Sequence, residues 1–305
     1  SREIAKKAEI PFSLLPTPYD PCDIVGGVTE EAAHITGLKA GTPVSAGCLD
    51  SVVATLGAGA VQEGDVALTI GSSGRICYIG SEPIYDKRLL NCRSPYQGLY
   101  TILQTTDNAG ISLRWFRDVF GDAVQQKAEA AGLSVYDYMN TLAEKVPAGC
   151  NGLVYLPYLA GEKSPIARGV FFGMSLSTDY GAFVRAIMEG VALSMRDCME
   201  IMPAAKKSIS PIPLGGGAAN SRVWCQIFAD VLNRPIVRLK SGETETLGDF
   251  IIAAESVGLS DVTRDFGKKL AAESEVLYPD SAAASVYDKT YQKYKAVYQN
   301  TKTLF

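Results

Sequence analysis

The sequence predicts an α/β fold in which helices flank a mixed β-sheet. Short apolar segments with strand periodicity alternate with longer segments of helical periodicity. Residues 66–79 alternate apolar positions, break at Gly-Ser-Ser-Gly and then alternate again, which predicts an antiparallel hairpin. Glycine clusters follow predicted strands, as at residues 215–217. Because a hairpin accompanies the strand–helix–strand units, the sheet is expected to be mixed rather than all parallel.

The first 60 residues predict two helices, a strand and a third helix. Residues 1–21 are typical of a helix followed by a proline-marked connector. A short helix is expected to begin after Thr29 as its N-cap and to end at Gly37. A strand at residues 44–47 then leads into a helix that ends at residues 57–59.

The middle of the chain continues the alternation. A strand at residues 100–104 precedes a helix with one apolar face, formed by Ile111, Trp115 and Val119. A buried strand at residues 153–156 runs into a polar loop. The strongest helical pattern follows, capped by Thr178 or Asp179, with apolar side chains at Phe183, Ile187, Val191, Met195, Cys198 and Met202. Glycine inside this helix, at position 190, predicts a close packing contact.

The last third predicts a strand, a triple-glycine turn, a helix and another strand over residues 211–239. A further helix has Leu247, Ile251 and Ala254 facing inward and Gly258 at its end. The final helix carries a stripe of tyrosines that we interpret as packing: Tyr287, Tyr291, Tyr294 and Tyr298.

Length, composition and charge narrow the classes of protein to which this chain can belong. The chain has 305 residues, enough for one large domain or two lobes, and 47% hydrophobic with 20% charged residues is ordinary for a globular protein. The net charge of −4 gives no basic surface for a nucleic-acid partner. There is no apolar run of about 18 residues, so we expect no membrane span and a soluble, cytoplasmic protein.

Cysteine and histidine usage argues against several site types. Seven cysteines stand far apart without a CxxC pair, which favours reduced thiols over disulfides or a zinc site. His34 is the single histidine, so a histidine-based triad or metal cluster is poorly supplied, and we expect no protein metal site.

Two glycine turns and one carboxylate are candidates for a ligand-binding or catalytic site. The turn at residues 71–74 is either a plain hairpin turn or a backbone cradle for an anion. The turn at residues 215–217 is either a tight strand-to-helix connection or a site where a ligand approaches the backbone. Asp50 lies between an apolar strand and an apolar helix, as a general base or as the N-cap of the helix that begins at Ser51.

Taken in order, these segments resemble the FGGY family of carbohydrate kinases, within the larger group that shares the actin-like or ribonuclease H-like ATPase fold. The resemblance rests on "GCLDSVVATLGAG", "GSSG", "LPYLAGEKSP", "ARGVFFGMSLS", "GGGAANSRVWCQIFADVLNRPI" and "TLGDFIIAA". It covers the chain from about residue 10 to its end. It implies the C-terminal lobe of a two-lobed sugar kinase, with residues 1–62 as the tail of the N-terminal, sugar-binding lobe and residues 63–305 as the nucleotide-binding lobe.

The resemblance also implies roles for particular residues. Asp50 matches the catalytic aspartate that accepts the proton of the sugar hydroxyl, with Ser51 beside the substrate. The second phosphate loop of the family, which binds the phosphates of ATP, matches Gly71, Ser72, Ser73 and Gly74. The adenosine-binding turn matches Gly215, Gly216, Gly217 and Asn220. Glu162 falls in a segment that borders the nucleotide cleft.

The implied activity is transfer of the γ-phosphoryl group of ATP, with Mg²⁺, to a sugar hydroxyl. The expected substrate is a xylulose-like ketopentose, with gluconate or a polyol second, and a homodimer is compatible with the family. The family's first lobe is largely missing from these residues, so we expect the 305 residues alone to be inactive. Ser51 also stands where many ketopentose kinases have Asn or Gln, which weakens the assignment of the sugar.

Two other functions remain open. The first is a non-catalytic nucleotide-binding module of the same fold, although the presence of Asp50 favours the enzyme. The second is a hydrolase that uses the Asp50 carboxylate. It fits less well because no second catalytic carboxylate stands at a recognisable spacing.

Overall fold

The computed structural model describes residues 1–96, 98–161, 167–240, 244–263 and 274–305. Within them, one mixed sheet has the strand order β11-β10-β9-β3-β4-β6-β5. β3, β9 and β10 run parallel, and the remaining pairs are antiparallel, as the hairpin predicts. The strand bounds are β3 (Val66–Ile70), β4 (Gly74–Gly80), β5 (Leu90–Arg93), β6 (Tyr100–Thr106), β9 (Ile212–Gly215), β10 (Ile236–Arg238) and β11 (Glu275–Leu277).

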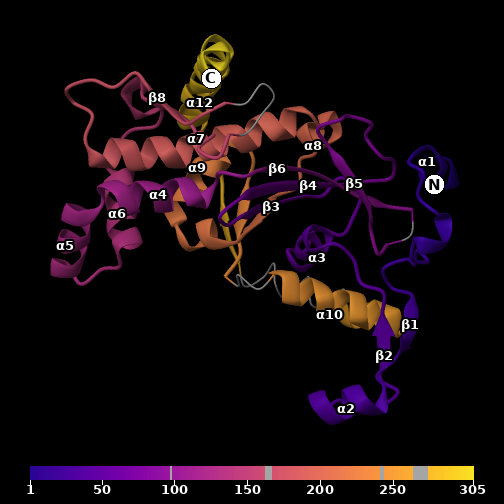
Figure 1. The fold of residues 1–305 in the computed structure, drawn as a ribbon. Coiled ribbons are helices and arrows are strands. Elements are labelled where there is room, and N and C mark those ends of the chain that lie inside the picture. Colours follow the sequence, from indigo (N-terminus) through magenta and orange to yellow (C-terminus); the bar gives the residue numbers. More distant parts are fainter. Residues whose placement is uncertain (97, 162–166, 241–243, 264–273) are drawn as a thin grey trace.

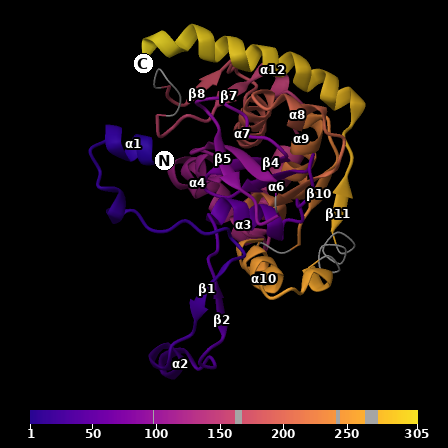
Figure 2. The same ribbon diagram turned by 90° about the vertical axis from the view of Figure 1, so that its right-hand side faces the viewer.

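Helices cover both faces of this sheet. Figure 1 shows α7 and α9 above the sheet and α3 with α10 below it, and in Figure 2 α12 crosses the outer side of α7 and α9. The helices nearest the sheet are α3 (Asp50–Gly57), α7 (Tyr180–Glu200), α9 (Arg222–Leu232) and α10 (Thr244–Ser256). Those further out are α1 (Arg2–Lys7), α2 (Glu30–Thr36), α4 (Gly110–Phe120), α5 (Asp122–Ala130), α6 (Val135–Glu144), α8 (Pro203–Lys207) and α12 (Ser281–Thr301).

The alternation in β3 explains the two layers. Val66, Leu68 and Ile70 are buried in the large core that includes the apolar side chains of α7 and α9. Ala67, between them, faces the opposite layer and packs in a small cluster with Ala58. Successive side chains of a strand point to opposite faces of the sheet. A strand that is covered by helices on both faces therefore carries apolar side chains on both faces.

The long helix α7 begins and packs as its sequence predicts. The Oδ1 atom of Asp179 accepts a hydrogen bond from the N–H of Ala182 at 2.8 Å, which confirms the N-cap. A Cβ built on Gly190 would stand 2.4 Å from the carbonyl oxygen of Tyr155. The glycine therefore lets α7 lie directly on β7 (Val154–Leu156), which pairs with β8 (Val170–Phe172).

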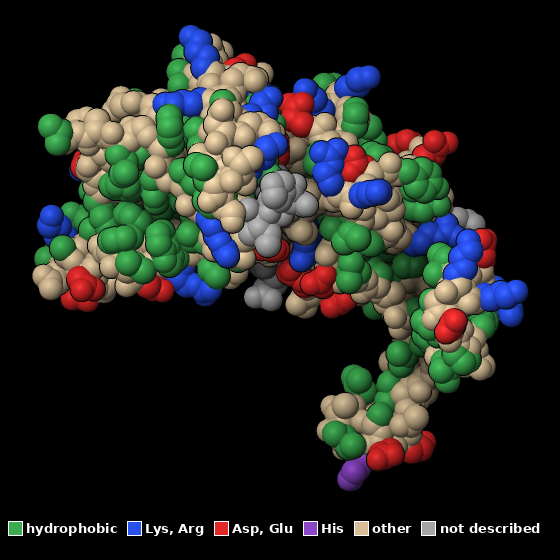
Figure 3. Space-filling model, turned by 45° about the horizontal axis from the view of Figure 1, so that its top comes forward, with side chains coloured by type: hydrophobic (Ala, Val, Ile, Leu, Met, Phe, Trp, Pro, Cys, Tyr) green, Lys and Arg blue, Asp and Glu red, His purple; other side chains and the backbone are tan. Residues whose placement is uncertain are grey.

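A narrow arm projects from the body of the molecule. It consists of the antiparallel strands β1 (Ile24–Gly27) and β2 (Pro43–Ser45) with α2 at its tip, as Figure 3 also shows. The hydroxyl of Thr29 caps α2, and Gly37 ends it at φ +76°, so both predicted ends are confirmed. β1 was not predicted from the sequence, and it is exposed along its whole length.

The predicted apolar face of α4 is wrong at Val119, although Trp115 of that face packs partly buried against the core. Ser112, Leu113 and Phe116 are its buried residues, whereas Val119 is 55% exposed. Phe116 packs among the aromatic rings of Tyr180 and other neighbours, so the buried stripe is rotated from the predicted one. The tyrosine stripe of α12, in contrast, packs as predicted, with Tyr287, Tyr291 and Tyr294 buried.

Candidate active site

Both glycine turns lie at the carboxyl ends of two neighbouring central strands, β3 and β9. β3 and β9 are parallel neighbours, with Thr69 paired to Gly215, so the turns that follow them emerge side by side. Gly216 has φ +80°, and a Cβ there would stand 2.7 Å from the carbonyl oxygen of Ile70. Only glycine allows this contact, which brings the second turn against the end of β3.

The hairpin turn is fixed by the start of α4. The carbonyl oxygen of Gly71 accepts from the N–H of Gly110 at 2.8 Å, and that of Ser72 accepts from the N–H of Ala109 at 3.0 Å. In the described part of the chain, the N–H groups of Ser72 and Ser73 donate to no protein acceptor. The Gly71 N–H donates to the carbonyl oxygen of Ser73 at 2.9 Å, so the acceptors of the turn are used internally, while the N–H groups of Ser72 and Ser73 remain for a ligand. Two such N–H groups side by side are an arrangement that suits an anion.

A cavity of about 510 Å³ opens between the two turns. Gly71 and Ser72 line it on one side, and Gly217 and Asn220 on the other. The remaining four predicted loop residues shape the turns without lining the cavity: Ser73, Gly74, Gly215 and Gly216. Before α9 the chain forms a short 3₁₀ turn (Gly217–Asn220), so the glycines do not open the helix directly as expected.

Asp50 lies beside the hairpin, outside the lining of this cavity. It is the first residue of α3, and Leu49 occupies the N-cap position, so the N-cap interpretation of Asp50 is wrong. The Asp50 side chain is 68% exposed, and its Oδ2 atom is 3.7 Å from Nη2 of Arg75, the residue after Gly74. The buried hydroxyl of Ser51 donates to Asp50 Oδ1 at 2.9 Å. The carboxylate is thus oriented by Ser51 and exposed to solvent.

Several residues of the cavity were missed by the sequence analysis. Arg114, Tyr136, Asp137, Asn140 and Trp224 all line it, from α4, α6 and α9. No helix was predicted from the sequence over the residues of α6. A capping pattern could have revealed α6, because its N-cap serine at 134 and the acidic residue three positions later bond to each other. The Glu162 prediction lies outside the described residues.

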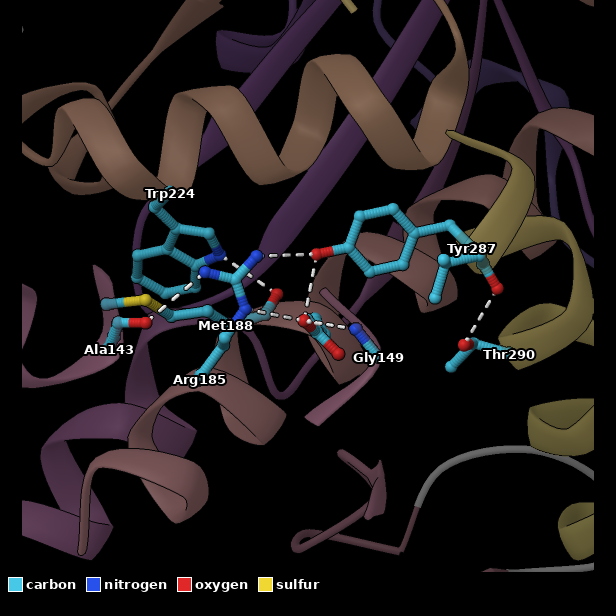
Figure 4. A network of polar contacts seen from close by, with 9 residues as sticks. Ala143, Gly149, Arg185, Met188, Trp224, Tyr287 and Thr290 are labelled. Carbon is cyan, nitrogen blue, oxygen red and sulfur yellow. Dashed lines mark hydrogen bonds and ion pairs between the residues drawn. The ribbon is translucent and has the colours of Figure 1, made fainter. Parts of the chain in front are cut away.

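A buried polar network supports the wall behind the cavity (Figure 4). Trp224 donates its Nε1–H to the carbonyl oxygen of Met188 at 3.0 Å. Arg185 donates to the carbonyl oxygen of Ala143 in α6 at 3.2 Å and to the hydroxyl of Tyr287 in α12 at 3.0 Å. These bonds join α6, α7, α9 and α12, so the cavity wall is built on a connected framework.

The carboxylate of Glu189 is the centre of that network. Its Oε1 atom accepts from Arg185 Nε at 2.8 Å, from the Tyr287 hydroxyl at 2.8 Å and from the Gly149 N–H at 3.1 Å. Burial raises the pKa of Glu189, and the adjacent Arg185 guanidinium opposes that rise. A fully buried acid with three donors has a structural function here, because the cavity does not reach it.

None of the helices among the described residues combines the length and the hydropathy that crossing a bilayer would require. No three His, Cys, Asp or Glu side chains in that part of the chain lie together in a way that could hold a metal ion.

The chain resembles carbohydrate kinases in sequence and in structure. It is 31% identical over 286 residues to a xylulose kinase of Staphylococcus epidermidis, which covers 92% of this chain and 56% of that protein. It is 34% identical over 243 residues to a gluconokinase of Bacillus licheniformis, covering 76% of this chain and 46% of that protein. The chain thus spans about half the length of these relatives.

A solved structure supports the same relationship. The crystal structure of xylulose kinase from Rhodospirillum rubrum superimposes with a TM-score of 0.83 at 33% identity, over 100% of this chain and 61% of that one. The fold is therefore the actin-like fold of the sugar kinases. Residues 66–257 match the model of the C-terminal domain of this family, and the chain belongs to the FGGY family of carbohydrate kinases.

Proposed function

We propose that this protein is an ATP-dependent kinase that phosphorylates a hydroxyl of a small sugar. The observation that carries the proposal is the convergence of both glycine turns on one cavity, with the Asp50 carboxylate beside the first turn. A phosphoryl transfer needs donors for the phosphates, a bound nucleoside and a base near the attacking alcohol. This edge of the sheet supplies candidates for all three.

The cavity is suited to ATP. Its volume of about 510 Å³ lies within the range of small-molecule sites. The free N–H groups of Ser72 and Ser73 bind the phosphates, and the turn at Gly217 and Asn220 holds the adenosine. The other glycines named above contribute by allowing the two turns to approach each other. Mg²⁺ enters with the nucleotide, since this ion is commonly bound through substrate phosphates and neutralises their charge.

Asp50 acts as the general base. It accepts the proton of the sugar hydroxyl as that oxygen attacks the γ-phosphoryl group. Ser51 contributes by holding Oδ1 of this carboxylate, which leaves Oδ2 toward Arg75 and solvent. Nη2 of Arg75 lies 3.7 Å from that oxygen. Ser51 therefore affects the substrate through the orientation of Asp50.

The first candidate for the sugar is a xylulose-like ketopentose, and the second is gluconate or a polyol. Relatives named xylulose kinase and gluconokinase support ketopentose and gluconate as candidates. We further propose that residues 1–62 are the tail of the sugar-binding lobe and residues 63–305 the nucleotide-binding lobe. The exposed apolar side chains of the arm, such as Ile24, Val25 and Val44, are what such a tail would present to the rest of its lobe. A cytoplasmic location and a homodimer complete the proposal.

The test is an ADP-release assay on the protein isolated from its native source at its natural length. D-xylulose, gluconate and xylitol are supplied in turn with ATP and Mg²⁺. Sugar-dependent ADP release that disappears in Asp50→Asn supports the kinase. Equal ATP binding by both proteins without turnover would instead identify a non-catalytic nucleotide-binding module. The 305-residue chain alone is expected to release no ADP, and turnover by it would contradict the two-lobe requirement.

A further inference from the structure

We propose that Asn140 recognises the nucleotide base, with Ser221 as the residue that positions it. This inference rests on the proposed function, because it assumes that the cavity binds an adenine nucleotide. Asn140 lies on α6 and Ser221 is the N-cap of α9, and both line the cavity. The Ser221 hydroxyl donates to Asn140 Oδ1 at 2.8 Å.

The hydrogen bonds of Ser221 fix the orientation of the Asn140 amide. The Oγ atom of Ser221 accepts the N–H of Trp224 at 3.2 Å, as an N-cap does. A hydroxyl has a single proton, which must therefore go to another acceptor. Oδ1 of Asn140 is that acceptor. If the amide were reversed, its NH₂ group would face Ser221 and the hydroxyl proton would lose the acceptor that it has.

The amide nitrogen of Asn140 is consequently left for a ligand. Among the described residues, Nδ2 of Asn140 donates to no protein acceptor, and the side chain is half-buried at the cavity wall. An NH₂ group is a pure donor, so its partner must be an acceptor. The ring nitrogens of adenine are acceptors, and the exocyclic amine is a donor. Asn140 therefore donates to a ring nitrogen.

This assignment agrees with the division of the cavity. The phosphates are assigned to the hairpin turn between β3 and β4, whereas Asn140 and Ser221 belong to the wall formed by α6 and α9. That wall also carries Trp224, whose indole is held by the Met188 carbonyl oxygen. A base bound there meets a fixed aromatic ring and one oriented donor, and these are the groups that recognise a nucleobase.

The experiment compares ADP with its 1-deaza, 3-deaza and 7-deaza analogues by titration calorimetry on the protein at its natural length. Each analogue replaces one ring nitrogen by C–H and so removes one acceptor. We expect one analogue to bind the unmodified chain about tenfold more weakly than ADP does, as the loss of a buried hydrogen bond predicts. In Asn140→Asp the new carboxylate faces the ring nitrogen, so that variant should prefer the same analogue over ADP.

Two further variants complete the design. Ser221→Ala should bind ADP more weakly and discriminate less between ADP and that analogue, because the Asn140 amide is no longer oriented. If the loss of the helix cap had only a structural effect, the discrimination between the two nucleotides would stay unchanged. Asn300→Asp makes the same chemical change on an exposed part of α12 and should behave as the unmodified chain.

The outcomes separate the two proposals. If the unmodified chain binds ADP but Asn140→Asp keeps the same ranking of all four nucleotides, the role of Asn140 is refuted and the nucleotide site stands. If the unmodified chain binds no ADP, the nucleotide site itself is refuted and the assignment of Asn140 falls with it.

Discussion

Gly248 in α10 lies directly on the carbonyl oxygen of Val53 in α3, and a Cβ at this position would stand 1.9 Å from that oxygen. Gly57 of α3 makes the reciprocal contact, with a Cβ position 1.8 Å from the carbonyl oxygen of Thr244. The two helices therefore touch backbone to backbone. Since α3 begins with Asp50, this contact places the proposed base relative to the body of the molecule.

Replacing Gly248 by alanine should push α3 and α10 apart. Overpacking of this kind costs about 1–3 kcal/mol or more, because the clashing atom is backbone and cannot rotate away. Urea unfolding of Gly248→Ala should show a lower midpoint than that of the unmodified chain. Gly26→Ala is the matched control, since no atom lies within 4 Å of its Cβ position. Equal midpoints for both variants would mean that the helices separate without cost.

In the protein at its natural length, replacing Asp50 by asparagine should lower turnover strongly and leave the fold intact. Loss of a general base lowers the rate by about 10²–10⁴-fold. The side chain is exposed and its ion pair with Arg75 is long, so we expect a change in stability within about 0.5 kcal/mol. The readouts are ADP release at saturating sugar and the urea midpoint.

The control for this variant is Asp20→Asn, which alters another exposed aspartate that lies 4.0 Å from an arginine, Arg93. It should retain the activity of the unmodified protein. Full activity of Asp50→Asn would remove Asp50 from the mechanism, whereas a large drop in its stability would make the activity result uninterpretable as a loss of the base.

Trp224 should report occupation of the cavity. The chain has two tryptophans, and only Trp224 lines the cavity between the glycine turns. In the variant Trp115→Phe, the remaining indole fluorescence should change in a saturable way when ADP is added. Its spectrum should not respond to sugar alone. A nucleotide that binds by calorimetry without altering this fluorescence would have to bind elsewhere.

Alkaline pH should destabilise the protein through buried thiols and phenols. Burial raises the pKa of Cys77 to about 11 and that of Tyr155 to about 12. Both values are above those of the unfolded chain, so the unfolded state loses these protons first as pH rises. The associated stability is complete below about pH 9 and is lost progressively toward pH 11 to 12, by about 1.4 kcal/mol per pH unit for each group.

The measurement is the urea midpoint between pH 8 and pH 11 in the presence of a reductant. Cys77→Ala should show a shallower decline above pH 9 than the unmodified chain, even if its midpoint at pH 8 is lower. A midpoint that is constant up to pH 11 would contradict the raised pKa values.

The local patterns of the chain predicted the parts of the structure that depend on neighbours in sequence. The hairpin, the cap at Asp179 and the close packing at Gly190 follow from periodicity, from capping chemistry and from the absence of a side chain. The wrong predictions concern tertiary context. Val119 is apolar but exposed, because Leu113 and Phe116 turn α4 toward its aromatic neighbours.

The residues of the cavity show the same difference between local patterns and tertiary context. Its glycine turns could be recognised because each is a local motif after a strand. Asn140 could not, because its importance comes from Ser221, which lies 81 residues further along the chain. The sequence left Asp50 open as a general base or as a helix N-cap between apolar elements. The structure excludes the cap and has an exposed carboxylate next to Arg75, a neighbour that the sequence did not predict.

The parallel pairing of β3 with β9 also has a consequence for the order of folding. Leu68 pairs with Leu214, so a long stretch of chain must be synthesised and closed into a loop before the two strands can meet. Non-local pairings of this kind form late and slowly. The hairpin turn can exist early, but the cavity requires both strands. On the proposed function, the ability to bind a nucleotide should therefore appear only at the end of folding, so that a newly made chain binds its ligand last.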